Sequence, residues 1–418
     1  MSDYLKALNE KEEYQQNLRS KLKDFDVAVN ISVNAIGTSK FSNYSKLLIA
    51  YFDQILSQKS SERVIHYNTW DGIQIIHYFK NANPHQFKEK MMKLEDEHPL
   101  GRLIDLDVYS NNKENSLSRD TLRKCYLCDQ PAFVCQKEKN HHIDELIFYY
   151  NNEIEVYFED LICKLIKESM LLELNLEDKF GLVTPTSTGS HQDMDYQLMV
   201  KAIEPVSYYL AKMFINGLRY NDLETLALEN QKIGIIAEEE MLNVTGGINC
   251  YKGLIYNLGL IITASIYSIL NGQTFYQIFD NVKEIAKLTL TDDNLNTFGL
   301  HAYQNYGFGG IRKEAFEGMP SLQLAYRTMT TVNDFYLRKS LISLIINLED
   351  SVFLKRSGSI EKMREHQEKF MKVNFSSEEE IKELTNYCIK YNLSFGGAAD
   401  LLVTIIYLKK LLKIFSLI

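Results

Sequence analysis

Residues 238–253 read E-E-E-M-L-N-V-T-G-G-I-N-C-Y-K-G and lead directly into an apolar helix. The segment places acidic residues, glycines and one lysine at the start of that helix. Glycines let a backbone approach a phosphate closely, and helix N-termini favour anions. A second segment, residues 303–320, reads Y-Q-N-Y-G-F-G-G-I-R-K-E-A-F-E-G-M-P and repeats the combination. Together they predict a polyphosphate nucleotide site, although glycines before helices also serve as ordinary caps.

Four charged side chains in these two segments carry the predicted chemistry. Lys252 and Arg312 can pair with phosphate oxygens, whereas Glu238 and Glu314 can hold Mg2+ or move a proton. With Asn249, they are expected to line one deep cleft, because a helical bundle gathers distant residues on facing helix ends or inner faces.

The composition indicates a globular enzyme rather than a nucleic-acid-binding or membrane protein. The chain has 418 residues, 45% of them hydrophobic, which suggests two or three domains. Its net charge of -9 disfavours binding to nucleic acid, which usually needs a basic surface. The first residues contain no apolar signal core, so a cytoplasmic location is expected. Two apolar stretches, 254–270 and 401–418, are interrupted by polar residues or lysines and predict buried helices, with no membrane span.

The chain changes character near residue 150. Before that point, β-prone runs at 25–33, 63–67 and 103–109 alternate with a helical stretch at 44–58. After about residue 153, helical periodicity continues to the end, and the whole chain holds only six prolines. The pattern predicts a small α+β domain over residues 1–151, followed by a larger all-α helical domain over 152–418. No Gly/Ser/Pro-rich linker divides them, so the boundary is expected in or beside a helix.

The segment H-P-L-G-R-L-I-D-L-D-V-Y, residues 98–109, predicts a strand with an acidic face. Period-two alternation places Asp105 and Asp107 on one side and the apolar residues between them towards the core. Two such carboxylates suit Mg2+, which would align an attacking hydroxyl and stabilise a departing pyrophosphate. A solvated edge strand is the alternative. Neighbouring cationic side chains favour phosphate binding: His98, Arg102 and Arg119.

Three of the six cysteines, Cys125, Cys128 and Cys135, precede the pair His141 and His142. Such a set can form a tetrahedral Cys3His zinc site. The short spacing and single C-x-x-C favour reduced thiols packed in a small domain, with Zn2+ as the alternative. A disulfide framework is not expected.

These N-terminal blocks resemble a known family. Residues 98–108, Ser118 with Arg119, and 123–135 are similar to the citrate lyase holo-acyl-carrier-protein synthases, the apo-citrate lyase phosphoribosyl-dephospho-CoA transferases. The resemblance covers roughly residues 25–145 and implies a nucleotidyltransferase-like domain. In that family's reaction, a serine hydroxyl of the citrate lyase acyl carrier protein (gamma subunit) attacks a triphosphate-bearing precursor, and pyrophosphate leaves.

The helical part resembles the triphosphoribosyl-dephospho-CoA synthases, which make that same precursor. The matching blocks follow in the family's order: G-L-V with H-Q-D-M (181–194), I-G-x-x-x-E (233–238), T-x-G-x-N-x-x-K-G (245–253), G-G-I-R-x-E-A (309–315), E-D-S (349–351) and N-L-S-x-G-G-x-A-D-L-L (392–402). Several blocks in order are far more specific than a single motif. A fusion of the maker and the user of one intermediate is also chemically sensible.

The resemblance implies that the ribose C1 of ATP is joined to the 2'-hydroxyl of 3'-dephospho-CoA and that adenine leaves. Such glycosyl transfer needs carboxylates near the ribose and a proton for the leaving base. The carboxylates that match family motifs are Asp193, Glu238, Glu314, Asp350 and Asp400. The triphosphate or acid–base candidates are His191, Lys252 and Arg312, with Asn249 and Gly253 shaping the loops. For Asp193 and Asp400, helix capping and complementing the helix dipole are the structural alternatives.

The chain departs from the family's pattern at several positions. The family usually has Asp at Thr184, Lys at Gln192, His at Tyr251, Gly at Lys313, Glu at Phe316, Asn at Val352 and Gly at Ser357. Glutamine lacks the charge of lysine, and tyrosine does not readily replace an imidazole in proton transfer near neutral pH.

Two functions of the chain are therefore possible from the sequence. In the first, the chain is a bifunctional transferase that makes and installs the citrate lyase prosthetic group. In the second, only the N-terminal transferase is active, and the C-terminal half binds nucleotide, CoA or a partner.

Overall fold

The computed structural model describes residues 2–68, 72–112, 116–119, 121–289, 309–415 and 417, with the backbone alone for residues 2–8, 38, 67 and 68. The chain divides into two compact units, Met1–Phe158 with Lys413–Ser416, and Glu159–Leu412 with Leu417–Ile418. We call them the α+β unit and the helical unit. The division falls within the long helix α5 (Ile143–Leu174).

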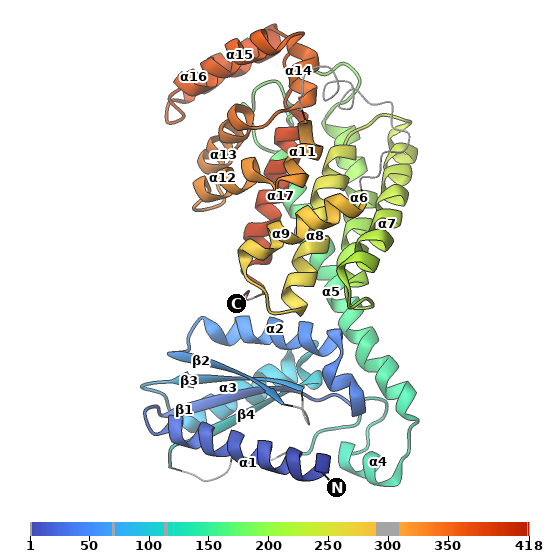
Figure 1. Cartoon of the computed structure of the whole chain (residues 1–418), viewed down its shortest axis with the longest axis vertical. Coiled ribbons are helices and arrows are strands. Elements are labelled where there is room, and N and C mark those ends of the chain that lie inside the picture. The colour runs from blue at the N-terminus through green and yellow to red at the C-terminus, as the bar shows by residue number, and fades with distance from the viewer. Residues whose placement is uncertain are drawn as a thin grey trace. The chain divides into compact units, whose positions relative to one another are not determined.

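The α+β unit is built on a four-stranded antiparallel sheet in the order β2-β3-β1-β4 (Figure 1). Its strands are β1 (Val27–Val33), β2 (Glu62–Asn68), β3 (Gly72–Phe79) and β4 (Ile104–Ser110). Its helices are α1 (Ser2–Leu22), α2 (Asn43–Ser57), α3 (Pro84–Glu97), α4 (Ala132–Glu138) and the first part of α5, with short 3-10 turns η1 (Gly37–Phe41) and η2 (Gly101–Leu103). The predicted strands and the predicted helix at 44–58 are confirmed, whereas β3, α1 and α3 were not anticipated.

The two faces of the sheet differ in character. Residues paired across neighbouring strands point to the same side, so the pairing shows which residues share a face. One face is apolar and packs against α2 and α3, which lie across the sheet from α1 (Figure 1). On the other face, α1 takes part in an apolar cluster made of Tyr14, Leu18, Leu22, Phe25, Ala28, Ile76, Tyr78 and Tyr109. Farther along this α1-side face, towards the start of β4, the residues become polar: Asn30, Ser32, Asp105 and Asp107.

The helical unit continues from α5 through helices of seven to 23 residues. They are α6 (Tyr196–Asn216), α7 (Leu223–Thr245), α8 (Lys252–Leu270), α9 (Phe275–Thr289), α11 (Gly310–Phe316), α12 (Pro320–Thr328), α13 (Asp334–Asn347), α14 (Ser351–Ser357), α15 (Ile360–Lys372), α16 (Glu378–Lys390) and α17 (Gly396–Leu411). The predicted helical character after residue 153 is confirmed in the described residues. Residues 303–308 of the second glycine-rich segment lie outside them.

Helix α8 is the centre of the helical unit and packs against α6, α7, α9 and α17 (Figure 1). Among the described residues, α8 is the one helix that is both long enough and apolar enough to cross a membrane. However, 83% of its apolar stretch is buried inside the protein. This agrees with the sequence, which predicts a buried helix at 254–270. Helix α17 is likewise buried over most of its length.

The turn between α7 and α8 shows how the glycine-rich segment works locally. Gly246, with φ of 67°, ends α7 in the left-handed conformation that favours glycine. Asn249 then accepts a hydrogen bond from the backbone N–H of Lys252 at 2.9 Å, which satisfies one of the free donors at the start of α8. The loop therefore fixes Lys252 and Gly253 at a helix N-terminus.

Candidate active sites

The first candidate site is the acidic stretch of β4. Asp105 and Asp107 are partly exposed, and the residues beside them, Ile104 and Leu106, are fully buried, as the alternation predicts. Asn30 on the neighbouring strand β1 pairs with Asp107 and lies on the same face. Its buried Oδ1 accepts no hydrogen bond from any described residue. Two carboxylates and an amide oxygen form the oxygen-rich donor set that Mg2+ prefers.

The electrostatics of this site favour a cation. Burial, and to a smaller extent the negative charge of Asp105, raise the pKa of Asp107 to about 6. Lys88 and Arg123 oppose this shift with weaker effects. A cation between the two carboxylates would offset both the burial and the repulsion that raise this pKa.

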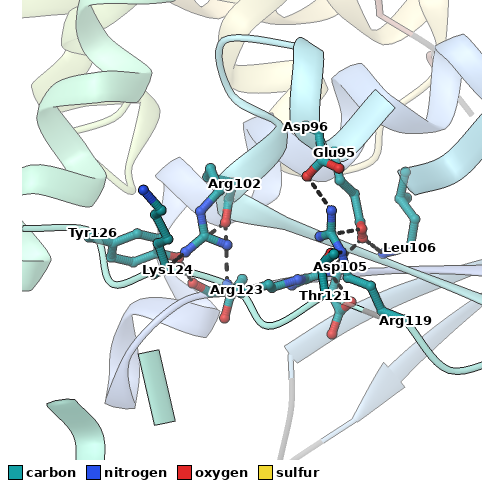
Figure 2. A network of polar contacts seen from close by, with 11 residues as sticks. Glu95, Asp96, Arg102, Asp105, Leu106, Arg119, Thr121, Arg123, Lys124 and Tyr126 are labelled. Atoms are coloured by element: carbon teal, nitrogen blue, oxygen red, sulfur yellow. Dashed lines mark hydrogen bonds and ion pairs between the residues drawn. The ribbon is translucent and has the colours of Figure 1, made fainter. Parts of the chain in front are cut away.

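An arginine bridges this site to α3 (Figure 2). Arg123 donates to Glu95 Oε1 at 2.6 Å and to Asp105 Oδ1 at 2.8 Å. The same Glu95 oxygen accepts the backbone N–H of Leu106 at 2.8 Å, so it also satisfies the free edge of β4. Arg119, expected to bind phosphate, pairs with Glu95 at 3.4 Å and with Asp96. Sequence reasoning missed Glu95, Arg123 and Asn30, although Arg123 lies inside a matched block.

Two other predicted phosphate ligands make contacts elsewhere in the α+β unit. His98 ends α3, and its Nε2 lies 3.2 Å from the Tyr51 hydroxyl and 3.3 Å from the Tyr157 hydroxyl. Burial lowers the pKa of His98, so the ring is neutral near pH 7. Arg102 donates to the backbone carbonyl of Lys124 (Figure 2). These contacts favour structural roles for both side chains.

The thiol-rich segment also comes together in space. Cys125, Cys128, Cys135 and His141 each offer a ligand atom, and all four atoms lie within 4.8 Å of one another. All three thiols are free. His142 is different, since its ring is largely exposed and lies 3.3 Å from Asp144.

The second candidate site is a pocket of about 650 Å³ in the helical unit. It is bounded by the N-terminal ends of α8, α14 and α17 and by the loop before α6. The predicted residues that line it are His191, Asp193, Asn249, Lys252, Gly253, Asp350 and Asp400. Lining residues that sequence reasoning did not single out as site residues include Glu173, Lys179, Glu349, Arg356 and Ser394. Three helix N-termini at one pocket suit an anionic ligand.

Two buried carboxyl groups lie at the base of these helix ends. Asp350 caps α14 by accepting the backbone N–H of Val352 at 2.8 Å, and its other oxygen accepts that of Ala398 in α17 at 3.1 Å. Asp400 has a pKa raised well above its usual value, chiefly by burial and then by the charges of Asp350 and Glu173. Asp350 therefore holds two helix ends together, and Asp400 is the carboxyl most suited to carry a proton near neutral pH.

The cationic side chains lie around the same pocket. Lys252 forms an ion pair with Glu238 at 2.7 Å, which places Glu238 next to the pocket rather than among its lining residues. Arg356 donates to the backbone carbonyl of Ser190 at 2.7 Å and so holds the loop that carries His191. His191 Nε2 lies 2.8 Å from Ser394 Oγ, and its pKa is lowered, first by burial and then by Arg356.

Not every predicted residue reaches the pocket. Glu314 is buried and accepts the backbone N–H groups of Ser321 and Leu322 at 2.6 and 3.2 Å, which places its carboxylate at the start of α12. Arg312 lies on α11, and its neighbour Ile311 is the residue of that helix that lines the pocket. Asp193 is 64% exposed and is not the cap of α6, since Asp195 makes that contact. The expected cleft thus gathers Asn249 and Lys252, with Glu238 beside them.

The departures from the family pattern fall into different settings. Tyr251 lines the pocket, and its buried hydroxyl makes no hydrogen bond to any described residue. Lys313 pairs with Glu349 at 2.9 Å, and this contact neutralises an acidic side chain at the pocket wall. Thr184 accepts the backbone N–H of Ser187 at 3.1 Å and stabilises a turn. Gln192 and Phe316 are exposed.

Replacing Gly253 with alanine is expected to disrupt the pocket. A Cβ atom at this position would lie 2.2 Å from Asp400 Oδ2, which forces either helix α8 or the carboxyl to move. Alanine normally stabilises a helix interior relative to glycine, so a loss of about 1 kcal/mol or more in unfolding free energy would show overpacking. Thermal or denaturant unfolding measures it. Gly234→Ala is the matched control, because its Cβ would meet the flexible end of Met213 at 3.3 Å and Ile255 Cγ2 at 4.0 Å, an ordinary contact. Equal effects of both changes would contradict the argument.

The α+β unit thus holds an acidic site that suits a cation, and the helical unit holds a pocket that suits an anionic ligand. Comparisons with known proteins identify the family. A family model described as ATP:dephospho-CoA triphosphoribosyl transferase matches residues 159–417, and one described as apo-citrate lyase phosphoribosyl-dephospho-CoA transferase matches residues 1–157. The chain belongs to these two families joined in tandem.

Three relatives align with about two thirds of this chain or more. Protein CitXG of Leuconostoc mesenteroides subsp. cremoris is 32% identical over 78% of this chain and 78% of its own length. Protein CitXG of Haemophilus influenzae is 28% identical over 77% of this chain and 76% of its own length. The 2-(5''-triphosphoribosyl)-3'-dephosphocoenzyme-A synthase of Haemophilus ducreyi is 26% identical and aligns over 68% of this chain and 99% of its own length. The chain is therefore a transferase for both steps in making the citrate lyase prosthetic group.

Proposed function

We propose that the pocket of the helical unit makes the triphosphoribosyl precursor and that the acidic face of β4 transfers it. In the first step, ATP and 3'-dephospho-CoA react and adenine leaves. In the second step, nucleotidyltransferase-like chemistry moves phosphoribosyl-dephospho-CoA to a serine of the citrate lyase acyl carrier protein (gamma subunit), and pyrophosphate leaves. The observation that carries the proposal is one pocket in the helical unit that is lined by two buried carboxyls, Asp350 and Asp400, and also by Lys252 and His191.

The pocket residues fit the first step in distinct ways. Lys252, at the start of α8, would bind the triphosphate, where the helix dipole adds to its charge. Asp400, which favours its protonated form, would deliver a proton to the departing adenine. Asp193 and Glu238 remain candidates for the ribose or for a metal, and Arg312 remains a candidate for the outer phosphates.

The acidic face of β4 fits a magnesium ion, because it offers two carboxylates and an unsatisfied amide oxygen. Asp105, Asp107 and Asn30 would hold the ion, which when bound offsets the charge of the pyrophosphate group. Arg123 fixes one oxygen of Asp105 and leaves the other oxygen of that carboxylate for a ligand. Asp107, when ionised, would accept the serine proton or orient its hydroxyl.

The alternative is that only the N-terminal transferase is active. Tyr251 favours it, because burial raises the pKa of its hydroxyl well above the usual range, and the group cannot exchange protons as an imidazole would. Incubating the full chain with ATP and 3'-dephospho-CoA and measuring free adenine decides between the two. Release of adenine at a steady rate supports both activities. Absence of adenine, with normal modification of apo-carrier protein by purified precursor, would leave the alternative.

Magnesium binding to the full chain should depend on pH through Asp107. The proton must leave this carboxyl before the ion binds, and its pKa is raised to about 6. Affinity should therefore fall roughly tenfold per pH unit below that value and level off above about pH 7. Calorimetric titration with Mg2+ at several pH values measures it. In Asp107→Asn, this pH dependence should disappear, and a persistent slope in the variant would contradict the assignment.

A further inference from the structure

We propose that Cys125, Cys128, Cys135 and His141 bind one structural Zn2+, which holds Arg123 in place beside the acidic face of β4. The donor set is Cys3His, a combination typical of closed structural zinc sites. Sγ of Cys128 lies 3.4 Å from Sγ of Cys135 and 3.3 Å from Nε2 of His141. In a tetrahedral site with Zn–S bonds of about 2.3 Å, the ligand atoms lie roughly 3.8 Å apart, so only small movements are needed.

The backbone around the first two cysteines already has the shape that a metal turn needs. Sγ of Cys125 accepts hydrogen bonds from the backbone N–H groups of Leu127 and Cys128. The backbone N–H of Cys125 donates to the carbonyl of Gln130 at 2.8 Å, which closes the turn. Backbone donors directed at a sulfur are outer contacts that orient it as a metal ligand. Both ligands of the C-x-x-C pair are thus oriented before an ion arrives.

The other two ligands come from a helix and the loop after it. Cys135 lies in α4 and is buried, and Asn140 directs its side-chain amide to that sulfur at 3.9 Å. Lys139, with φ of 53°, ends α4 in the left-handed conformation and turns the chain back, so that His141 reaches Cys128. Outer contacts of this kind orient metal ligands.

The segment has no hydrophobic core that would replace a metal. Among residues 121–142, all of which the structure describes, Cys135 is the one buried residue. Two of the segment's large apolar side chains are exposed, Leu122 at 70% and Phe133 at 54%. Small segments of this kind commonly depend on a metal for their fold, because the binding free energy takes the place of apolar burial.

The position of the cluster gives the ion a consequence for the transfer site. Arg123 stands two residues before Cys125, and its backbone carbonyl accepts the N–H of Ala132 at 2.8 Å within the same turn. Its side chain bridges Glu95 and Asp105. The carbonyl of the intervening Lys124 accepts a hydrogen bond from Arg102 (Figure 2). Zinc would therefore act as a positioning element for Arg123 and have no contact with the substrates.

The test uses the full chain, purified under reducing conditions without a metal-affinity tag. Elemental analysis should give one zinc per chain that survives dialysis, and Co2+ substitution should give the absorption bands of a tetrahedral cobalt–thiolate site. His141→Asn should lower zinc affinity at least tenfold, whereas His142→Asn keeps it. Cys128→Ser should behave like the first variant and Cys163→Ser, in the helical unit, like the wild type.

Three results would overturn the proposal. They are a wild-type chain that binds no zinc after reconstitution, equal zinc loss in the two histidine variants, and a Cys128–Cys135 disulfide in the freshly purified protein. For the positioning role, removal of zinc by a chelator should slow transfer to the carrier protein and leave adenine release unchanged. Equal transfer rates with and without zinc would reject that role, independently of whether the proposed reactions are correct.

Discussion

Changing Asp105 or Asp107 to asparagine is expected to slow transfer to the carrier protein by two to three orders of magnitude, roughly the scale for removing one preorganised electrostatic contact. Asparagine keeps the size of the side chain and removes the charge that a magnesium ion and the attacking hydroxyl need. Neither side chain is part of the apolar core, so the α+β unit should remain folded. The measurement is the rate of modification of apo-carrier protein with purified precursor, which bypasses the helical unit.

The two variants should also differ from each other. Asp105 pairs with Arg123 at 2.8 Å. Its replacement removes this ion pair and leaves Arg123 paired with Glu95 alone at this site. Asp107 carries the raised pKa, and its replacement relieves like-charge repulsion. We therefore expect Asp107→Asn to be at least as stable as the wild type and Asp105→Asn to be slightly less stable. Asp24→Asn, an exposed change at the end of α1, is the control. Transfer at the wild-type rate in both β4 variants would refute this site.

The sequence predicted the strand that carries these carboxylates because its pattern is local. Alternation of Asp105 and Asp107 with buried apolar residues identifies both the strand and its faces without any knowledge of the fold. Glu95 and Arg123 were missed for the opposite reason. Each is an unremarkable charged residue in its own segment, and only the packing of α3 against β4 brings the two together. Similarly, α1 and α3 are rich in charged residues, and α3 buries only Met91 and Glu95 along its length, so their helical pattern is weak.

In the helical unit, the glycine-rich segments pointed correctly to a helix N-terminus but not to every side chain around it. Lys252 and Gly253 follow directly from the turn chemistry of the loop before α8. Glu314 has the same acidic character in the same kind of segment, yet it caps α12. Spacing alone does not show which way a helical side chain points when the neighbouring helix comes later in the chain. Lys179 and Glu173 form an ion pair at 2.8 Å in the pocket wall. The two residues are close in sequence, but the burial that gives the pair its place in the pocket wall depends on tertiary packing.

The second large effect is expected for Asp400→Asn. This carboxyl faces the pocket, and burial, Asp350 and Glu173 all raise its pKa well above the usual value. The shift favours the protonated form, so this carboxyl is suited to protonate the leaving adenine. Asparagine has nearly the same shape but cannot transfer a proton. Adenine release should fall about 100-fold to 10,000-fold, the range for losing a general acid, with little change in the affinity for ATP.

The stability of the variant separates this role from a structural one. A buried carboxyl whose folded pKa is raised destabilises the native state above its unfolded pKa, because its ionisation is then disfavoured in the fold. Asp400→Asn should thus be as stable as the wild type at pH 7 or more stable. Asp350→Asn is the contrasting variant, since Asp350 accepts hydrogen bonds from Val352 and Ala398 at two helix ends and its change should cost roughly 1 to 2 kcal/mol. Single-turnover adenine release and denaturant unfolding on both variants provide the data. If Asp400→Asn unfolds easily, or releases adenine at the wild-type rate, the carboxyl supports the fold and the proton for adenine comes from another group.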